Sequence, residues 1–124
     1  MSSIRVSRFE LQLLEKLWHK GPLSVREIQE RLPERDRPAY TTVQTMIYRL
    51  EEKGAVRRVK KVGNAHVFEA VLSRKTVHRR VVNDLLSVFG GSAAPLVSHL
   101  VETGKLTLAD IKELEKTLSS MEHE

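Results

Sequence analysis

The segment 40–54 constrains the fold more than any other part of the chain, because its apolar residues recur at helical spacing. They follow the i, i+3, i+4, i+7 pattern of a helix that buries one face, and they are Val43, Met46, Ile47 and Leu50. Thr41, with Gln44 three residues later, matches a capping box and predicts where the helix begins. Gly54 predicts where it ends, since glycine readily takes the left-handed conformation that terminates helices.

The face opposite these apolar residues is polar and carries short hydroxyls, an amide, a tyrosine and an arginine. Such side chains donate and accept hydrogen bonds, and a threonine methyl can contact the methyl group of thymine, so this face suits the base edges of DNA. The candidate base-reading residues are Thr41, Thr42, Gln44, Thr45, Tyr48 and Arg49. The alternative interpretation is an ordinary amphipathic surface helix with solvated threonines.

Two earlier segments predict helices that complete a helix-turn-helix pattern. Residues 7–10 and 24–27 each match a capping box, in which a glutamate follows a serine by three positions. The helices that they open are expected to run to about Lys20 and about Leu32. A polar turn then leads into the third helix, which in this pattern can lie in the major groove of DNA.

Two β-prone runs follow the third helix, at residues 55–61 and 65–70, and flank the turn Gly63-Asn64. A glycine–asparagine pair between such runs predicts a β-hairpin, and a hairpin in this position is the wing of a winged helix. The first strand is rich in cations that can bind phosphate or line a minor groove; these are Arg57, Arg58, Lys60 and Lys61. The alternative is a solvated edge strand that charge protects from aggregation.

The positive charge of the chain is concentrated in its first two thirds. Residues 1–82 carry eighteen Lys and Arg against nine Asp and Glu, a net charge of +9, whereas residues 83–124 carry three against seven, a net charge of −4. This split predicts a head that binds a polyanion and a tail with another role.

The chain lacks the residues and motifs that several classes of function require. Without cysteine, the chain has no disulfide, thiol nucleophile or thiolate metal site. It also has no Gly-x-Ser-x-Gly elbow, glycine-rich phosphate loop or pair of histidines at metal-ligand spacing, so we expect no enzyme, metal or cofactor. No apolar run approaches the roughly 20 residues of a membrane-spanning helix, and the N-terminus lacks a secretory signal. We therefore expect a cytoplasmic protein without membrane insertion.

Residues 73–124 predict three helices, broken at Gly90-Gly91 and Gly104, whose apolar stripes exceed what so short a segment can bury. Exposed apolar surface of this size usually marks an interface, and a two-fold dimer is the simplest way to cover it. The predicted dimer residues are Val77, Val81, Leu85, Leu96, Leu100, Leu108, Ile111, Leu114, Leu118 and Met121. The alternative is that these residues pack within one monomer.

The head resembles the penicillinase-repressor family of bacterial winged-helix regulators, often called the BlaI/MecI/CopY family. The resemblance depends on Leu17-Trp18, on residues 21–28 and on residues 40–54, whose order and spacing match the family. The helical tail looks similar too, so the likeness covers nearly the whole chain. It implies a homodimeric repressor that binds a dyad-symmetric operator.

Two departures from the family concern its signals. Copper-responsive members carry a cysteine motif near the C-terminus, and this chain has no cysteine. Antibiotic-responsive members are inactivated when a membrane sensor metalloprotease cuts the tail at an Asn-Phe bond. The equivalent position here holds His99-Leu100, so either the protease specificity or the inducing signal differs.

These observations predict a mainly α fold with a small β-hairpin wing, divided into a winged helix-turn-helix domain at 1–72 and a three-helix dimerisation domain at 73–124. We expect a dimeric DNA-binding repressor whose partners are operator DNA, a second copy of the chain and, by resemblance, a membrane sensor metalloprotease. The competing interpretation is a winged-helix protein-interaction module with no DNA role. The sequence does not give the operator sequence, the regulated genes or the inducing signal.

Overall fold

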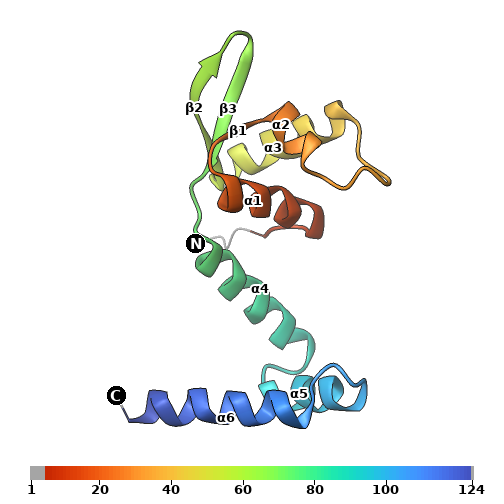
Figure 1. The fold of residues 1–124 in the computed structure, drawn as a ribbon, viewed down its shortest axis with the longest axis vertical. Coiled ribbons are helices and arrows are strands. Elements are labelled where there is room, and N and C mark those ends of the chain that lie inside the picture. Colours follow the sequence, from red (N-terminus) through yellow and green to blue (C-terminus); the bar gives the residue numbers. More distant parts are fainter. Residues whose placement is uncertain (1–4, 124) are drawn as a thin grey trace. The chain divides into compact units, whose positions relative to one another are not determined.

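The computed structural model describes residues 5–123 and is mainly helical with one small antiparallel sheet (Figure 1). The elements in chain order are α1 (Arg8–Lys20), β1 (Leu23–Ser24), α2 (Val25–Glu30), α3 (Tyr40–Glu52), β2 (Val56–Val62), β3 (Ala65–Ala70), α4 (Arg74–Val88), α5 (Ala93–Glu102) and α6 (Leu108–Glu122). A helix-turn-helix followed by a hairpin and then by helices confirms the predicted fold class.

The contacts within the chain divide it into a unit that ends at Val81 and a second unit that starts at Val82. This division falls inside α4, so the first turns of that helix belong with the head. The expected domain boundary after residue 72 stays a prediction.

The first unit packs α1, α2, α3 and the sheet around one hydrophobic core. On α3 the core residues Val43, Ile47 and Leu50 come from the apolar face that periodicity predicted. The core as a whole includes Leu13, Leu14, Leu17, Ile28, Leu32, Val43, Ile47, Leu50, Val56 and Phe68. Val77, in the first turn of α4, is 1% exposed and joins the same core. The prediction that Val77 lies in a dimer interface is therefore wrong, because a side chain already enclosed by its own chain has no surface for a partner.

The start of α4 is attached to α1 by a polar and aromatic cluster around Trp18. The indole Nε1 donates a hydrogen bond to the carbonyl oxygen of Leu72 at 2.9 Å. The guanidinium of Arg74 lies 5.6 Å from the Trp18 ring centre, and the ring of His78 meets Trp18 edge-on at 5.9 Å. Glu15 of α1 faces both Arg74, at 3.7 Å, and His78, at 3.3 Å. These contacts hold the start of α4 on the head.

Both predicted capping boxes of the head are formed. The hydroxyl of Ser7 accepts from the backbone N–H of Glu10 while the Glu10 carboxylate accepts from the Ser7 N–H, and Ser24 and Glu27 make the same pair of bonds. The predicted box at Thr41 is wrong, because the N-cap of α3 is Ala39, two residues earlier, and Ala39 makes no side-chain hydrogen bond.

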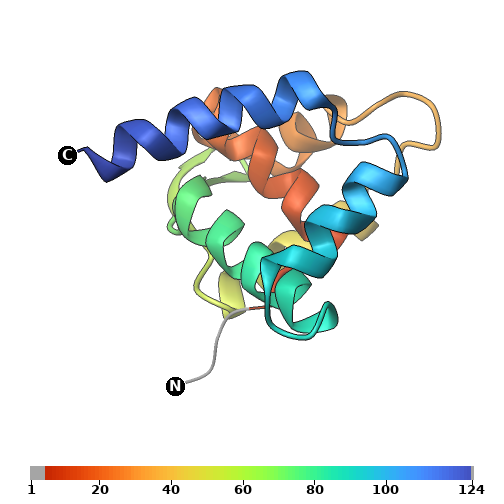
Figure 2. The ribbon, with the colours of Figure 1, turned by 90° about the horizontal axis from the view of Figure 1, so that it is seen from below.

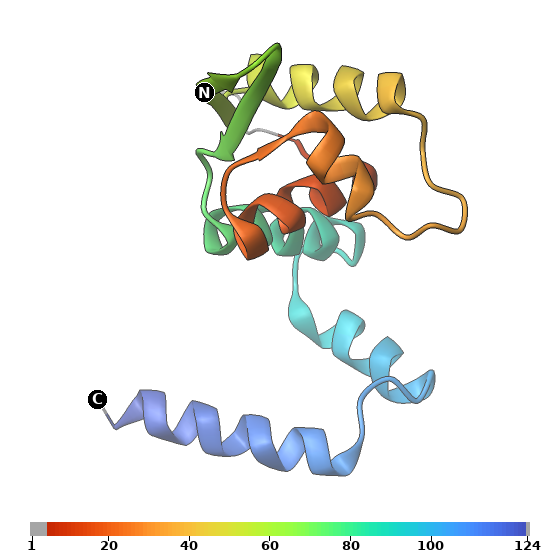
Figure 3. The same ribbon diagram turned by 45° about the horizontal axis from the view of Figure 1, so that its top comes forward.

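The connection between α2 and α3 is a long loop, visible in Figure 3. Arg37 holds it closed, since its Nη2 donates to the carbonyl oxygens of Glu30, at 2.8 Å, and Leu32, at 2.7 Å. Gln29 also reaches the loop, donating from Nε2 to the carbonyl oxygen of Pro38 at 3.0 Å. These bonds fix how α3 enters the fold without a capping side chain.

The hairpin forms where the Gly63-Asn64 turn predicted it, and Gly63 takes a positive φ of 60°. The sheet order is β1-β3-β2, all antiparallel, with a register irregularity between Arg58 and Lys60. The two-residue strand β1 was not predicted. It exists because Leu23 and Ser24 pair with the inner strand β3 while joining α1 to α2, a tertiary effect that leaves no periodic signal in the sequence.

The second unit contains α5 and α6, joined by a short turn (Figure 2). Thr107 and Asp110 form a capping box at the start of α6, and Gly90 and Gly91, both with positive φ, separate α4 from α5. Neither α5 nor α6 contains a buried residue. Most apolar residues of these helices are exposed, although Leu96 and Leu100 of α5 are half-buried.

No single helix among residues 5–123 is long and apolar enough to cross a membrane. By length and composition alone α4 and α5 together reach that threshold, but they are bent by 85° at the break between them.

Candidate nucleic-acid interface

The outward face of α3 carries the candidate base-reading residues, and most of them are exposed. Thr41, Thr42, Thr45, Tyr48 and Arg49 are exposed, whereas Gln44 is half-buried. The opposite face is enclosed, with Val43, Ile47 and Leu50 each 0% exposed. The buried face fixes the rotation of the helix, so the polar face is rigidly directed to solvent.

Hydrogen bonds within α3 orient several of these side chains. The Thr45 hydroxyl donates to the carbonyl oxygen of Thr41 at 2.9 Å, and Gln44 Nε2 donates to the Tyr48 hydroxyl at 3.2 Å. A hydroxyl oxygen that is bonded in this way still has capacity for another partner. The face is thus ordered, and it retains donors and acceptors of the kind that read base edges.

The four cations of the wing differ in what they contact. Arg57 Nε donates to Glu69 Oε2 at 2.6 Å across the β2–β3 pair, and Arg58 Nε donates to Glu51 Oε2 at 2.9 Å. Lys60 and Lys61 make no ion pair within residues 5–123. Among the four, the two lysines are therefore the wing cations without an ion-pair partner in this range.

Arg58 forms a junction between α3 and the wing. Its guanidinium lies 5.2 Å from the ring centre of Tyr48 and 5.5 Å from that of Phe68, and a second bond to Glu51 makes the ion pair bidentate. The two rings lie 6.3 Å apart. A guanidinium stacked on rings and paired with a carboxylate has little freedom to move, so Arg58 sets the position of the wing beside α3.

The end of α3 is fixed to α1 by a nearly buried carboxylate. Lys53 Nζ donates to both oxygens of Glu10 at 2.8 Å and to the carbonyl oxygen of Arg5 at 2.9 Å. Burial acts to raise the pKa of Glu10, but hydrogen bonds from Lys53 and Ser7 together outweigh it and lower that pKa below its ordinary value of 4.5. Glu10 is therefore held as a charged partner for Lys53.

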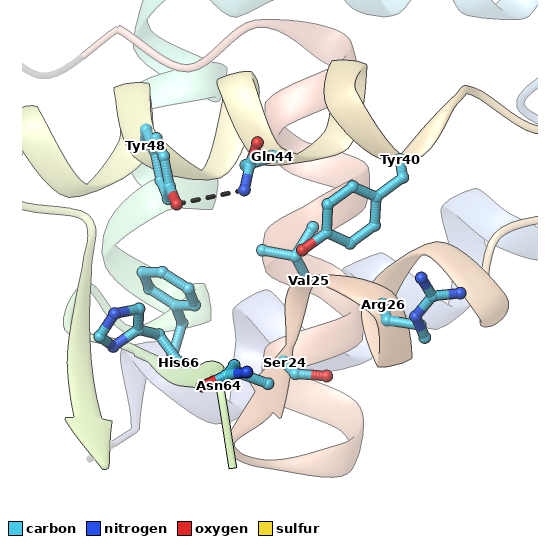
Figure 4. A pocket seen from close by; sticks show the side chains of 10 residues that line it. Ser24, Val25, Arg26, Tyr40, Gln44, Tyr48, Asn64 and His66 are labelled. Carbon is cyan, nitrogen blue, oxygen red and sulfur yellow. Dashed lines mark hydrogen bonds between the residues drawn. The ribbon is translucent and has the colours of Figure 1, made fainter. Parts of the chain in front are cut away.

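A pocket lies between α3, the start of α2 and the hairpin (Figure 4). Its walls come from all three elements, and the residues that line it are Ser24, Val25, Arg26, Tyr40, Gln44, Tyr48, Asn64, Ala65, His66 and Phe68. Of these residues, only Gln44 and Tyr48 were predicted from the sequence to contact DNA. Tyr40 could have been added to them, since it precedes them on the same helical stripe, but Arg26, Asn64 and His66 reach this place only through the tertiary fold.

The predicted dimer residues and the candidate cleavage region lie in the C-terminal helices. Of the predicted dimer residues beyond Val77, those exposed are Val81, Leu85, Leu108, Ile111, Leu114, Leu118 and Met121, and those half-buried are Leu96 and Leu100. His99 is exposed within α5, where its ring lies 6.1 Å from that of Phe89. The candidate cleavage region at His99-Leu100 is therefore helical.

A comparison with protein families matches residues 6–120 to the penicillinase repressor family. A search of curated proteins finds no match to the chain. The family match covers the helix-turn-helix, the wing and nearly all of the tail, so it explains the whole architecture. The chain therefore belongs to the penicillinase repressor family, and it is a winged-helix DNA-binding transcriptional repressor and not an enzyme.

Proposed function

We propose that this protein acts in the bacterial cytoplasm as a homodimer on a dyad-symmetric operator, with α3 of each copy in a major groove. The exposed polar face of α3 is the observation that carries the proposal. Thr41, Thr42, Gln44, Thr45, Tyr48 and Arg49 would contact base edges or the adjacent phosphates, since helices of this fold read DNA from that face.

The wing supplies electrostatic affinity in this proposal. Lys60 and Lys61 bind phosphates, because neither is held in an ion pair by another described residue. Arg57 and Arg58 were expected to bind phosphate too, but their pairing with Glu69 and Glu51 favours a role in holding the wing in place.

Dimerisation through the tail is supported by the exposure of its apolar stripe. On α6, Leu108 is 68% exposed and Met121 is 63% exposed, and Ile111, Leu114 and Leu118 lie between them on the same side of the helix. A seam at three- and four-residue spacing is typical of helices that pair with another helix. Two joined heads bind two half-sites with a gain in effective concentration that a single head lacks.

Release of the operator would follow from an event in the tail. Cleavage at His99-Leu100 by a membrane sensor metalloprotease would separate α6 from the head and so remove part of the dimer seam. Such a cut requires local unwinding of α5, which is feasible because α5 buries no residue of its own.

Substitution on α3 tests the proposed base contacts. Arg49→Ala and Thr45→Ala are each expected to weaken binding to a duplex selected from a random pool by about 1–3 kcal/mol, while binding to unselected duplex changes little. Glu52→Ala, at an exposed position near the end of the same helix, is the matched control. Fluorescence anisotropy with both duplexes measures the difference. Equal losses on selected and unselected DNA would show that α3 does not read sequence.

A further inference from the structure

The pocket between α3, α2 and the wing has a lining suited to an anion. Its polar groups are the hydroxyls of Ser24, Tyr40 and Tyr48, the amides of Gln44 and Asn64, the imidazole of His66 and the guanidinium of Arg26. None of the ten lining residues carries a carboxylate. A cavity with many donors and no negative charge favours an anionic group over a cation or an apolar ligand.

We propose that this pocket seats a backbone phosphate of the bound DNA, and that Arg26 is its charged ligand. This inference rests on the proposed function, because it assumes that α3 lies in a groove. Gln44 and Tyr48 belong both to the pocket and to the outward face of α3. The strand that borders the groove read by α3 therefore passes the mouth of the pocket.

Arg26 is prepared for this contact by its neighbour Tyr40. Its guanidinium carbon lies over the Tyr40 ring, 5.4 Å from the ring centre. This is a cation–π contact, in which the N–H groups of the arginine can still donate to an oxygen. Arginine is charged at every physiological pH and matches the geometry of phosphate oxygens. Arg26 is exposed, so the contact requires no rearrangement of the core.

Tyr48 contributes a second donor at the opposite wall (Figure 4). Its hydroxyl accepts the hydrogen bond from Gln44 Nε2 at 3.2 Å, which leaves the phenolic hydrogen to donate to an incoming oxygen. The ring itself is held by Phe68 and Arg58. The wing wall adds Asn64 and His66, so one phosphate would join α2, α3 and the wing.

Replacement of Arg26 tests the proposal directly. A second variant that loses the same charge elsewhere on the head serves as its control. Arg26→Gln should lower the slope of log K against log salt by about 0.9 on a random-sequence duplex, because one phosphate contact is lost. Arg31→Gln removes the same charge just after α2, where Arg31 donates to the Glu27 carbonyl oxygen and does not line the pocket. That control should leave the slope unchanged.

A second pair of variants keeps the test valid if Arg26→Gln does not fold. Asn64→Asp places a carboxylate in the pocket and should weaken binding at every salt concentration, whereas Gln12→Glu adds the same charge on α1, outside the lining, and should have a smaller effect. If each pocket variant that folds binds DNA in the same way as its control variant, and the wild type still binds DNA, the proposed phosphate site in the pocket is overturned but the proposed function is not. Failure of the wild type to bind any duplex at low salt would instead remove the proposed function and this inference with it.

Discussion

Glu10 shows how a single residue links local structure to the position of the DNA-binding helix. It closes the capping box of α1 and pairs with Lys53 just after α3, while only 3% of it is exposed. Because its folded-state pKa is below the ordinary value of 4.5, the unfolded chain binds a proton at Glu10 more readily than the folded chain does. The stability that Glu10 contributes is therefore fully present above pH 4.5 and is lost as the pH falls through the lowered pKa.

Glu10→Gln isolates this charge, because glutamine can still complete a capping box. We expect the variant to lower the free energy of unfolding at neutral pH by about 1 kcal/mol, a modest value because Lys53 is partly exposed. The loss should shrink as the pH falls below 4.5. Glu27→Gln, in the exposed box of α2, is the control and should cost less. Urea titrations at several pH values measure both, and a loss that is independent of pH would contradict the account.

Arg58 and Lys60 are close neighbours on one strand with different expected roles. Arg58→Gln should lower the free energy of unfolding by roughly 1 kcal/mol, because it breaks a partly exposed ion pair and two ring contacts, and it should leave the salt slope of DNA binding unchanged. Lys60→Gln should do the reverse, lowering the slope by about 0.9 with little change in stability. If both variants lower the slope equally, Arg58 contacts phosphate and is not mainly a structural junction.

At the scale of elements, the sequence predicted well where local chemistry decides the outcome. The serine and glutamate boxes of α1 and α2 and the Gly63-Asn64 turn are signals contained in a few adjacent residues, and each formed as predicted. The capping box predicted at Thr41 did not form, because the loop held by Arg37, and not a capping side chain, determines how the chain enters α3. Strand β1 was missed because two residues pair only with a strand that comes more than forty positions later.

The exposed apolar stripe of α6 is expected to hold the dimer together. Leu114→Gln combined with Leu118→Gln should raise the dissociation constant of the dimer at least tenfold, since burying each leucine contributes about 1.5–3 kcal/mol. Lys112→Gln, an exposed position on the same helix, should leave it unchanged. Sedimentation velocity at micromolar concentration distinguishes the two. A wild type that sediments as a single copy would remove the dimer from the account.

For the whole molecule, the charge split between head and tail predicted a polyanion-binding part, but not which cations serve it. Arg57 and Arg58 were indistinguishable in sequence from Lys60 and Lys61, and only the fold reveals that Glu69 and Glu51 face the two arginines. Arg26 and His66 were not predicted to lie together with the DNA-contacting residues, since they line one pocket only where α2 and the hairpin meet α3. Val77 was misassigned because a periodic stripe does not tell which of its members the head encloses.

The central claim is that two copies of the exposed face of α3 bind one duplex. Selection of binding sites from a random duplex pool, followed by hydroxyl-radical footprinting on the winning sequence, tests it most directly. The account predicts two protected half-sites related by a dyad and separated by one or more helical turns. A single protected site with no inverted repeat, or protection that does not depend on sequence, would contradict it.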